Sequence, residues 1–137
     1  MPAYNFMERW MPKILDGSKA QTIRRKRKRA TRPGDMLALY VGQRTRQCRL
    51  IGRAPCVRVT PVVIYPYSYF IKVNGFILAP QRTNMLAKRD GFDNLVEFFD
   101  FFKRYGDSCL EDFEIIEWDP KQLKQDAQDR QDDYGTH

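Results

Sequence analysis

Hydrophobic and polar residues follow two different periods along this chain, and each period predicts its own kind of element. Between residues 36 and 78 the apolar residues form short runs or alternate with polar ones, as is typical of strands. We expect strands over 36–41, 47–51, 56–64, 70–73 and 76–78, and a last one over 113–118. Pro61 lies within the strand expected over 56–64, and a proline there favours an edge strand or a strand that crosses between two sheets.

Residues 95–105 carry the strongest helical pattern in the sequence. Apolar residues recur there at spacings of three and four, and they are Leu95, Phe98, Phe99 and Phe102. Asn94 and Glu97 have the spacing of a capping box, which predicts where this helix begins. A shorter helix is expected over 12–16, and a short helix or turn over 84–90.

Turn residues and composition mark the boundaries between these elements. Gly17 is expected to end the first helix, and Asn74-Gly75 predicts a type I′ hairpin because both of its residues need positive φ. From Pro120 onward the sequence is polar and poor in apolar side chains, which predicts disorder. We therefore expect a single domain over 1–119 and a polar tail over 120–137.

The composition excludes several classes of protein. A length of 137 residues with 42% hydrophobic content is suited to one domain with a substantial core. No apolar run approaches the ~20 residues that cross a bilayer, so we expect a cytoplasmic protein without membrane contact. Three cysteines and one histidine, without metal-ligand spacing, predict no metal site, disulfide framework or cofactor. Cys48 and Cys56 are expected to point inward as small core residues.

Charge is distributed unevenly along the chain. The first 60 residues hold 15 Lys and Arg against 3 Asp and Glu, and the remaining residues hold 9 against 14. A basic half of this kind favours a polyanionic partner, and the acidic half offers a surface for a protein partner. The basic residues concentrate in a block over 24–32, which we call the basic arm. Like charges repel, so the arm is expected to be solvated, either as a phosphate-binding segment or as a simple linker.

RNA or another single-stranded nucleic acid is the partner that this pattern favours. Arginines and lysines would contact phosphates, and tyrosines near residue 67 would stack on unpaired bases unless they only pack at the rim of the sheet. The residues expected to contact nucleic acid are Arg24, Arg25, Lys26, Arg27, Lys28, Arg29, Arg32, Arg44, Arg46, Tyr65 and Tyr67.

One stretch resembles a known family. The run ILDGSKAQTIR over 14–24, followed by Pro33-Gly34-Asp35 opening a strand, resembles the ASCH family, a PUA-like group of small β-barrels linked to RNA. Asp90-Gly91-Phe92 before a helix and Ile116-Glu117-Trp118 in a final strand fall in the family's order, so the resemblance covers residues 5–119. It implies an α+β fold, a small PUA-like β-barrel of about six strands with flanking short helices.

The resemblance also implies a candidate catalytic set. Some ASCH proteins hydrolyse acylated cytidine nucleosides, and ribonuclease activity has been attributed to others. Their Lys and Thr in G-x-K-x-x-T-I-R, with a carboxylate before the second helix, correspond here to Lys19, Thr22 and Asp90. The family hydrolases carry glutamate where this chain has Asp90. A lysine that takes up a proton must have its pKa lowered by burial or by a nearby cation such as Arg24.

Three functions remain open on the sequence. The favoured hypothesis is a nucleic-acid-binding domain whose cleft, formed by Lys19, Thr22, Arg24 and Asp90, recognises a nucleotide or a modified nucleoside. The alternative is an amidohydrolase or ribonuclease that uses the same cleft. A third is an adaptor that recruits a protein through its acidic half. Asp90 could instead only cap the turn at Gly91 or pair with Arg24.

Overall fold

A computed structural model of the chain describes residues 1–125, which form an α+β fold built on a seven-stranded mixed sheet. The strands are β1 (Ala3–Phe6), β2 (Gln21–Arg25), β3 (Met36–Val41), β4 (Arg49–Tyr65), β5 (Phe70–Val73), β6 (Phe76–Ile77) and β7 (Leu110–Trp118). The helices are α1 (Met11–Asp16), α2 (Pro80–Arg89) and α3 (Leu95–Phe102), and the 3-10 turns are η1 (Glu8–Trp10), η2 (Lys103–Tyr105) and η3 (Pro120–Gln122).

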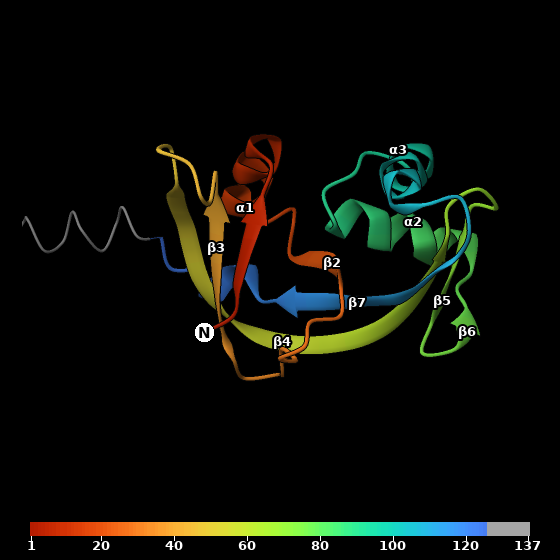
Figure 1. Ribbon diagram of the computed structural model, residues 1–137, viewed down its shortest axis with the longest axis horizontal. Coiled ribbons are helices and arrows are strands. Elements are labelled where there is room, and N and C mark those ends of the chain that lie inside the picture. The colour runs from red at the N-terminus through yellow and green to blue at the C-terminus, as the bar shows by residue number, and fades with distance from the viewer. Residues whose placement is uncertain (126–137) are drawn as a thin grey trace, which may run out of the picture.

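The long strand β4 connects the two parts of the sheet. Its first half pairs with β3, which pairs in parallel with β1, and its second half pairs with β7 and β5. Strand β2 extends the sheet beyond β7. In Figure 1, β4 curves along the molecule and the three α-helices lie on its concave side.

The sheet does not close, so the predicted α+β class is confirmed but the predicted barrel is not. Strands β1 and β2 are linked by side chains and not by a backbone ladder. Arg24 donates to the Asn5 carbonyl over 2.7 Å, and Arg27 donates to the Ala3 carbonyl. A closed barrel would require a backbone ladder between β1 and β2. Arginine side chains make the hydrogen bonds at this position instead.

The hydrophobic core lies between the sheet and the helices. Phe98, Phe99 and Phe102 of α3 are fully or almost fully buried, as their spacing predicts. The Asn94 side chain accepts a hydrogen bond from the Glu97 amide over 2.9 Å, which confirms the helix start.

Several predicted boundaries differ from those observed. The strands expected over 47–51 and 56–64 are one continuous strand, β4, that remains paired through Pro61. The helix expected over 84–90 begins four residues earlier, with Pro80 in its first turn. Strand β1 is absent from the sequence prediction, because it is short and is held by a pairing with distant β3.

One cysteine prediction is wrong. Cys56 is buried in β4 as expected, but Cys48 is exposed in the turn that precedes β4. The alternation that points Cys48 inward does not apply, because the strand begins only at Arg49. The Asn74-Gly75 hairpin is confirmed, with φ of 52° and 82° at its two central residues.

The ordered chain extends past the predicted end of the domain. Pro120–Gln122 forms η3, and the backbones of Lys124 and Arg53 exchange two hydrogen bonds of 2.8 Å. The rest of the predicted tail, residues 126–137, lies outside the described residues. Within residues 1–125, no helix has the length and apolar character needed to span a bilayer.

Candidate nucleotide site

The corner between α1 and β2 places the motif residues at the start of a strand. Gly17 ends α1 with φ of 87°, a conformation that glycine adopts without strain. The Lys19 amide then donates to the Lys13 carbonyl, and the Ala20 amide donates to the Arg89 carbonyl, both over 3.0 Å. The first bond ties the corner to α1 and the second joins it to the end of α2, where the Lys19 side chain meets Asp90.

Lys19 meets Asp90 in the interior of the protein. The Lys19 ammonium lies 2.6 Å from the Asp90 backbone carbonyl and 3.5 Å from its carboxylate. The two side chains are only 3% and 5% exposed. Gln21 adds a hydrogen bond of 3.4 Å from its amide nitrogen to the same carboxylate. Asp90 therefore does more than cap the turn, and its buried partner is Lys19.

Aromatic rings surround this pair. The Lys19 ammonium lies 5.1 Å from the Trp10 ring centre and 5.5 Å from that of Phe6. Phe92 meets Trp10 edge to face at 4.9 Å. Gly91 has φ of 101°, and a Cβ there would lie 2.7 Å from the Trp10 ring. The turn after α2 thus requires glycine, because the indole occupies the space of a side chain.

Burial shifts the pKa values of both members of the pair. Removal from water lowers the pKa of Lys19 from 10.5 to about 8, against the opposing effect of the Asp90 charge, and Arg24 lowers it further. Burial likewise raises the pKa of Asp90, although Lys19 and the Gln21 hydrogen bond counteract the rise. Each group is thereby brought nearer to the range in which proton transfer occurs at neutral pH.

Thr22 is held by its neighbour Arg24. The Arg24 Nε donates to the Thr22 hydroxyl oxygen over 2.9 Å, while its terminal nitrogen donates to the Asn5 carbonyl over 2.7 Å. Because Thr22 accepts this bond, its hydroxyl proton remains available to another acceptor. Burial lowers the pKa of Arg24, whose guanidinium also lies 4.9 Å from the Phe6 ring centre.

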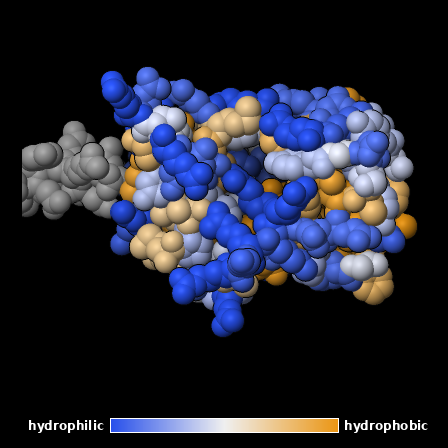
Figure 2. Space-filling model, viewed as in Figure 1, coloured by the Kyte–Doolittle hydropathy of each residue, from blue (hydrophilic) through white to orange (hydrophobic). Residues whose placement is uncertain are grey.

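These residues line one pocket of about 170 Å³. Its polar lining comes from Asn5, Lys19, Thr22, Arg24, Asp90 and Arg104, and its aromatic lining from Phe6, Trp10, Phe92, Phe101, Phe102 and Tyr105. Figure 2 shows a hollow on this face, between the part built on α1 and the part built on α2 and α3. Pockets that enclose whole drug-sized ligands measure about 300–1,000 Å³, so this one suits a single planar ring.

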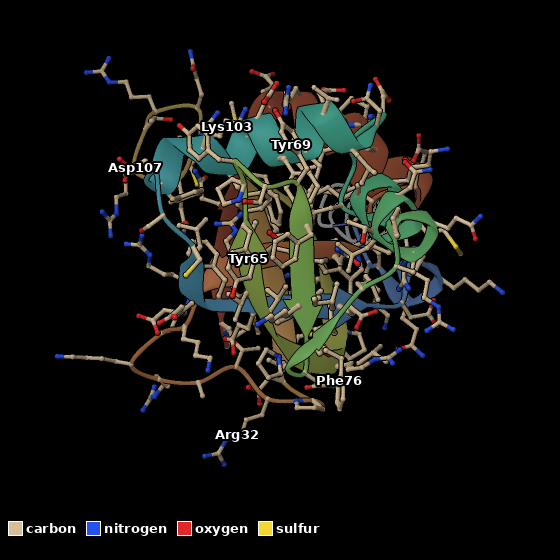
Figure 3. The ribbon with its side chains drawn as sticks, turned by 90° about the vertical axis from the view of Figure 1, so that its right-hand side faces the viewer. Arg32, Tyr65, Tyr69, Phe76, Lys103 and Asp107 are labelled. Atoms are coloured by element: carbon tan, nitrogen blue, oxygen red, sulfur yellow. The ribbon has the colours of Figure 1, made fainter. Side chains whose placement is uncertain are left out.

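The basic arm is more ordered at its base than predicted. Arg25 belongs to β2, the Lys26 amide donates to the Asp112 carbonyl over 2.7 Å, and the Arg27 guanidinium stacks 3.9 Å above the Tyr4 ring. Lys28, Arg29 and Arg32 are exposed, and Arg32 projects outward in Figure 3. Residues 25–27 are therefore exposed but anchored to the fold by these contacts.

The remaining predicted contacts do not join the arm in one surface. Arg44 and Arg46 follow β3, whereas the arm precedes it, so they lie at opposite ends of that strand. The Tyr65 ring stacks on Phe70 at 4.2 Å, and Tyr67 lies 5.0 Å from the Lys103 ammonium. In Figure 3 the neighbouring Tyr69, which Lys103 contacts, lies on the opposite side of the molecule from Arg32.

Several pocket residues were not anticipated from the sequence. Gln21 lies inside the motif and bonds to the Asp90 carboxylate behind the pocket, without lining the pocket itself. Arg104 and Tyr105 follow the phenylalanine-rich helix and carry no local signal for the pocket, since only the tertiary fold brings them to β2. Trp10 is buried in the core, and its ring also lines the pocket.

No cluster of three His, Cys, Asp or Glu side chains that could hold a metal ion occurs in residues 1–125. The sequence matches no protein-family model, and no curated protein matches it in sequence.

Proposed function

We propose that this chain is an ASCH-type nucleic-acid-binding domain whose pocket recognises a nucleotide, with RNA as the first candidate. The observation that supports it best is the buried Lys19–Asp90 pair, enclosed by aromatic rings and opening beside cationic residues. An aromatic wall stacks on a base, and hydrogen-bonding side chains read its edge.

The open side of the sheet is part of the same proposal. The pocket lies beside the place where β1 and β2 share no ladder and where Arg24 and Arg27 donate to carbonyls of β1. We regard the fold as a PUA-like barrel left open at this position, which gives a base access to the Lys19–Asp90 pair.

Binding is tested with fluorescently labelled single-stranded RNA and DNA of the same sequence. Lys19→Met keeps most of the side-chain volume and removes the ammonium, and it should weaken nucleotide binding about ten- to a hundred-fold. Lys88→Met removes an exposed lysine from α2 and serves as the matched control. Equal affinity of the two variants would exclude the pocket from binding, and an RNA affinity no higher than that for DNA would remove RNA from first place.

Hydrolysis of an N4-acylated cytidine is the second candidate, and the lowered pKa of Lys19 supports it. Neutral Lys19 would take the proton of Thr22 or of a water molecule, and the freed oxygen would attack the acyl carbon. The bond between that carbon and N4 then breaks, and protonated Asp90 gives its proton to the leaving amine. Attack by water gives the carboxylic acid directly; attack by Thr22 gives an ester that water hydrolyses to the same acid.

Turnover of N4-acetylcytidine separates the two candidates. If the pocket is catalytic, Lys19→Ala should abolish turnover. Thr22→Ala should abolish it as well if Thr22 is the nucleophile, because residues that act as a unit fail together, whereas attack by water would leave part of the activity. Asp90→Glu should retain activity, since it restores the carboxylate length of the family hydrolases. Absence of turnover in the unsubstituted protein, together with measurable nucleotide binding, would leave binding as the function.

A further inference from the structure

Two guanidinium groups lie beside Tyr105 at the pocket. Arg24 and Arg104 line the pocket together with this tyrosine. They come from two elements that are distant in the sequence, β2 and η2. Arg24 belongs to the cleft proposed above, but neither proposed function gives Arg104 a role.

Arg104 is oriented for a ligand and not for the protein. Its guanidinium stacks 4.0 Å from the Phe101 ring centre, and its Nε donates to the Phe101 carbonyl over 3.1 Å. Within the described residues, its two terminal nitrogens have no hydrogen-bond partner. A planar guanidinium held in this way presents two parallel donors, the arrangement that binds phosphate in a bidentate manner.

The carboxylate of the pocket does not neutralise this cluster. Asp90 is the one acidic residue among the described residues that line the pocket, and it is already paired with buried Lys19. The side of the pocket with Arg24 and Arg104 is therefore positive, and the exposed Arg104 can bind an anion.

From this arrangement we infer that the ligand is a phosphorylated nucleoside, with its base in the pocket and a phosphate bound by Arg104 beside Arg24. The inference rests on the proposed function and specifies its ligand class. The pocket volume of about 170 Å³ accommodates a base but leaves the sugar and phosphate at the mouth, where the guanidiniums lie. Arg24 supplies positive charge there while its own donors hold Thr22 and Asn5.

The test is a calorimetric comparison of cytidine, its 5′- and 3′-monophosphates, and a five-nucleotide oligocytidylate. At least one phosphorylated form should bind about ten-fold or more tightly than cytidine, because a charge-assisted bidentate contact contributes at that level. Arg104→Gln should remove most of this difference. Arg82→Gln removes one exposed arginine from α2 and should leave it intact. The monophosphates and the oligonucleotide distinguish a free nucleotide from a strand as the source of the phosphate.

Equal binding of cytidine and all its phosphorylated forms would overturn the inference while leaving the nucleotide pocket in place. A phosphate effect that survives Arg104→Gln would also overturn it, since the phosphate would then bind elsewhere, for example on the basic arm. If none of the four nucleosides and none of their phosphorylated forms binds, the proposed function fails together with the inference.

Discussion

At the scale of a single residue, Gly91 follows Asp90 and packs against the Trp10 ring, so it connects the polar and the aromatic parts of the site. Gly91→Ala should lower the stability of the fold more than a change of backbone conformation alone explains, because the added Cβ would lie 2.7 Å from the Trp10 ring. A left-handed conformation costs alanine about 1–2 kcal/mol, and overpacking adds roughly 1–3 kcal/mol. Thermal unfolding monitored by tryptophan fluorescence measures the loss.

Gly34→Ala is the matched control for that experiment. Gly34 has φ of 93°, close to the 101° of Gly91, but a Cβ added at Gly34 would have no atom within 4 Å. The Gly34→Ala variant should therefore lose only the stability that the left-handed backbone conformation costs, without the effect of a steric clash. An equal loss of stability in the two variants would mean that Trp10 moves aside at no cost and does not fix the pocket wall.

The buried Lys19 predicts a particular dependence of stability on pH. Its pKa falls from 10.5 to about 8 on folding, so between these values the unfolded chain binds the proton and the folded protein does not. The free energy of unfolding should therefore rise with pH in this window, by on the order of 3 kcal/mol. Below pH 8 both states are protonated and the full cost of burial is present.

Lys19→Met isolates this contribution, because the variant lacks the titrating group. The difference in unfolding free energy between the unsubstituted protein and Lys19→Met, measured by urea titration at pH 7, 8, 9 and 10, should shift in favour of the unsubstituted protein as pH rises. Lys88→Met, at an exposed position, should show no such trend. A flat difference for Lys19→Met would mean that Lys19 stays charged in the fold.

Some of the site could be predicted from the sequence at this scale, and some could not. Gly17 is a local signal for the end of the first helix, and the corner that follows it holds Lys19 and Thr22. The partner of Lys19 is suggested only by the resemblance, since 71 positions separate it from Asp90. The run of like charges predicts Arg24 in a solvated arm, but Arg24 folds back onto Thr22 and Asn5.

At the scale of elements, local sequence patterns predict those helices and turns that are stabilised by short-range interactions. The helix after Asn94 and the hairpin at Asn74-Gly75 are both formed by neighbours in sequence. The sequence pattern divides strand β4 in two because Gly52 to Pro55 looks like a break, but pairing with β3 on one side holds it continuous. The open sheet depends on β1 and β2, whose relation no local pattern encodes.

The hairpin offers a test at this scale. Gly75→Val should lower the melting temperature, since a β-branched residue would have to adopt a φ near 82°, at a cost of about 1–2 kcal/mol. Gly75→Asn should cost less, because asparagine tolerates the left-handed region. No atom lies within 4 Å of the added Cβ, so the difference reports backbone strain alone. Equal melting temperatures for both variants and the unsubstituted protein would show that the turn contributes little to folding.

At the scale of the whole molecule, positive charge is divided between two places with different structures. The cluster of Arg24 and Arg104 is fixed by hydrogen bonds beside the pocket, whereas Lys28, Arg29 and Arg32 are exposed on the arm. The fixed cluster suits one defined phosphate. The arm suits a polymer, because solvated cations contact successive phosphates without selecting a base.

This division predicts that the arm sets the salt dependence of RNA binding. Replacing Lys28, Arg29 and Arg32 together with alanine should reduce the slope of log affinity against log salt by up to about 2, at roughly 0.7 per phosphate contact on a single strand. Replacing Arg44, Arg46 and Lys121 instead removes the same charge away from the arm and should change the slope less. Titrations of labelled RNA between 50 and 300 mM salt measure it, with melting curves to verify folding. If the two triple variants give the same slope, net charge governs binding, and the arm has no role of its own.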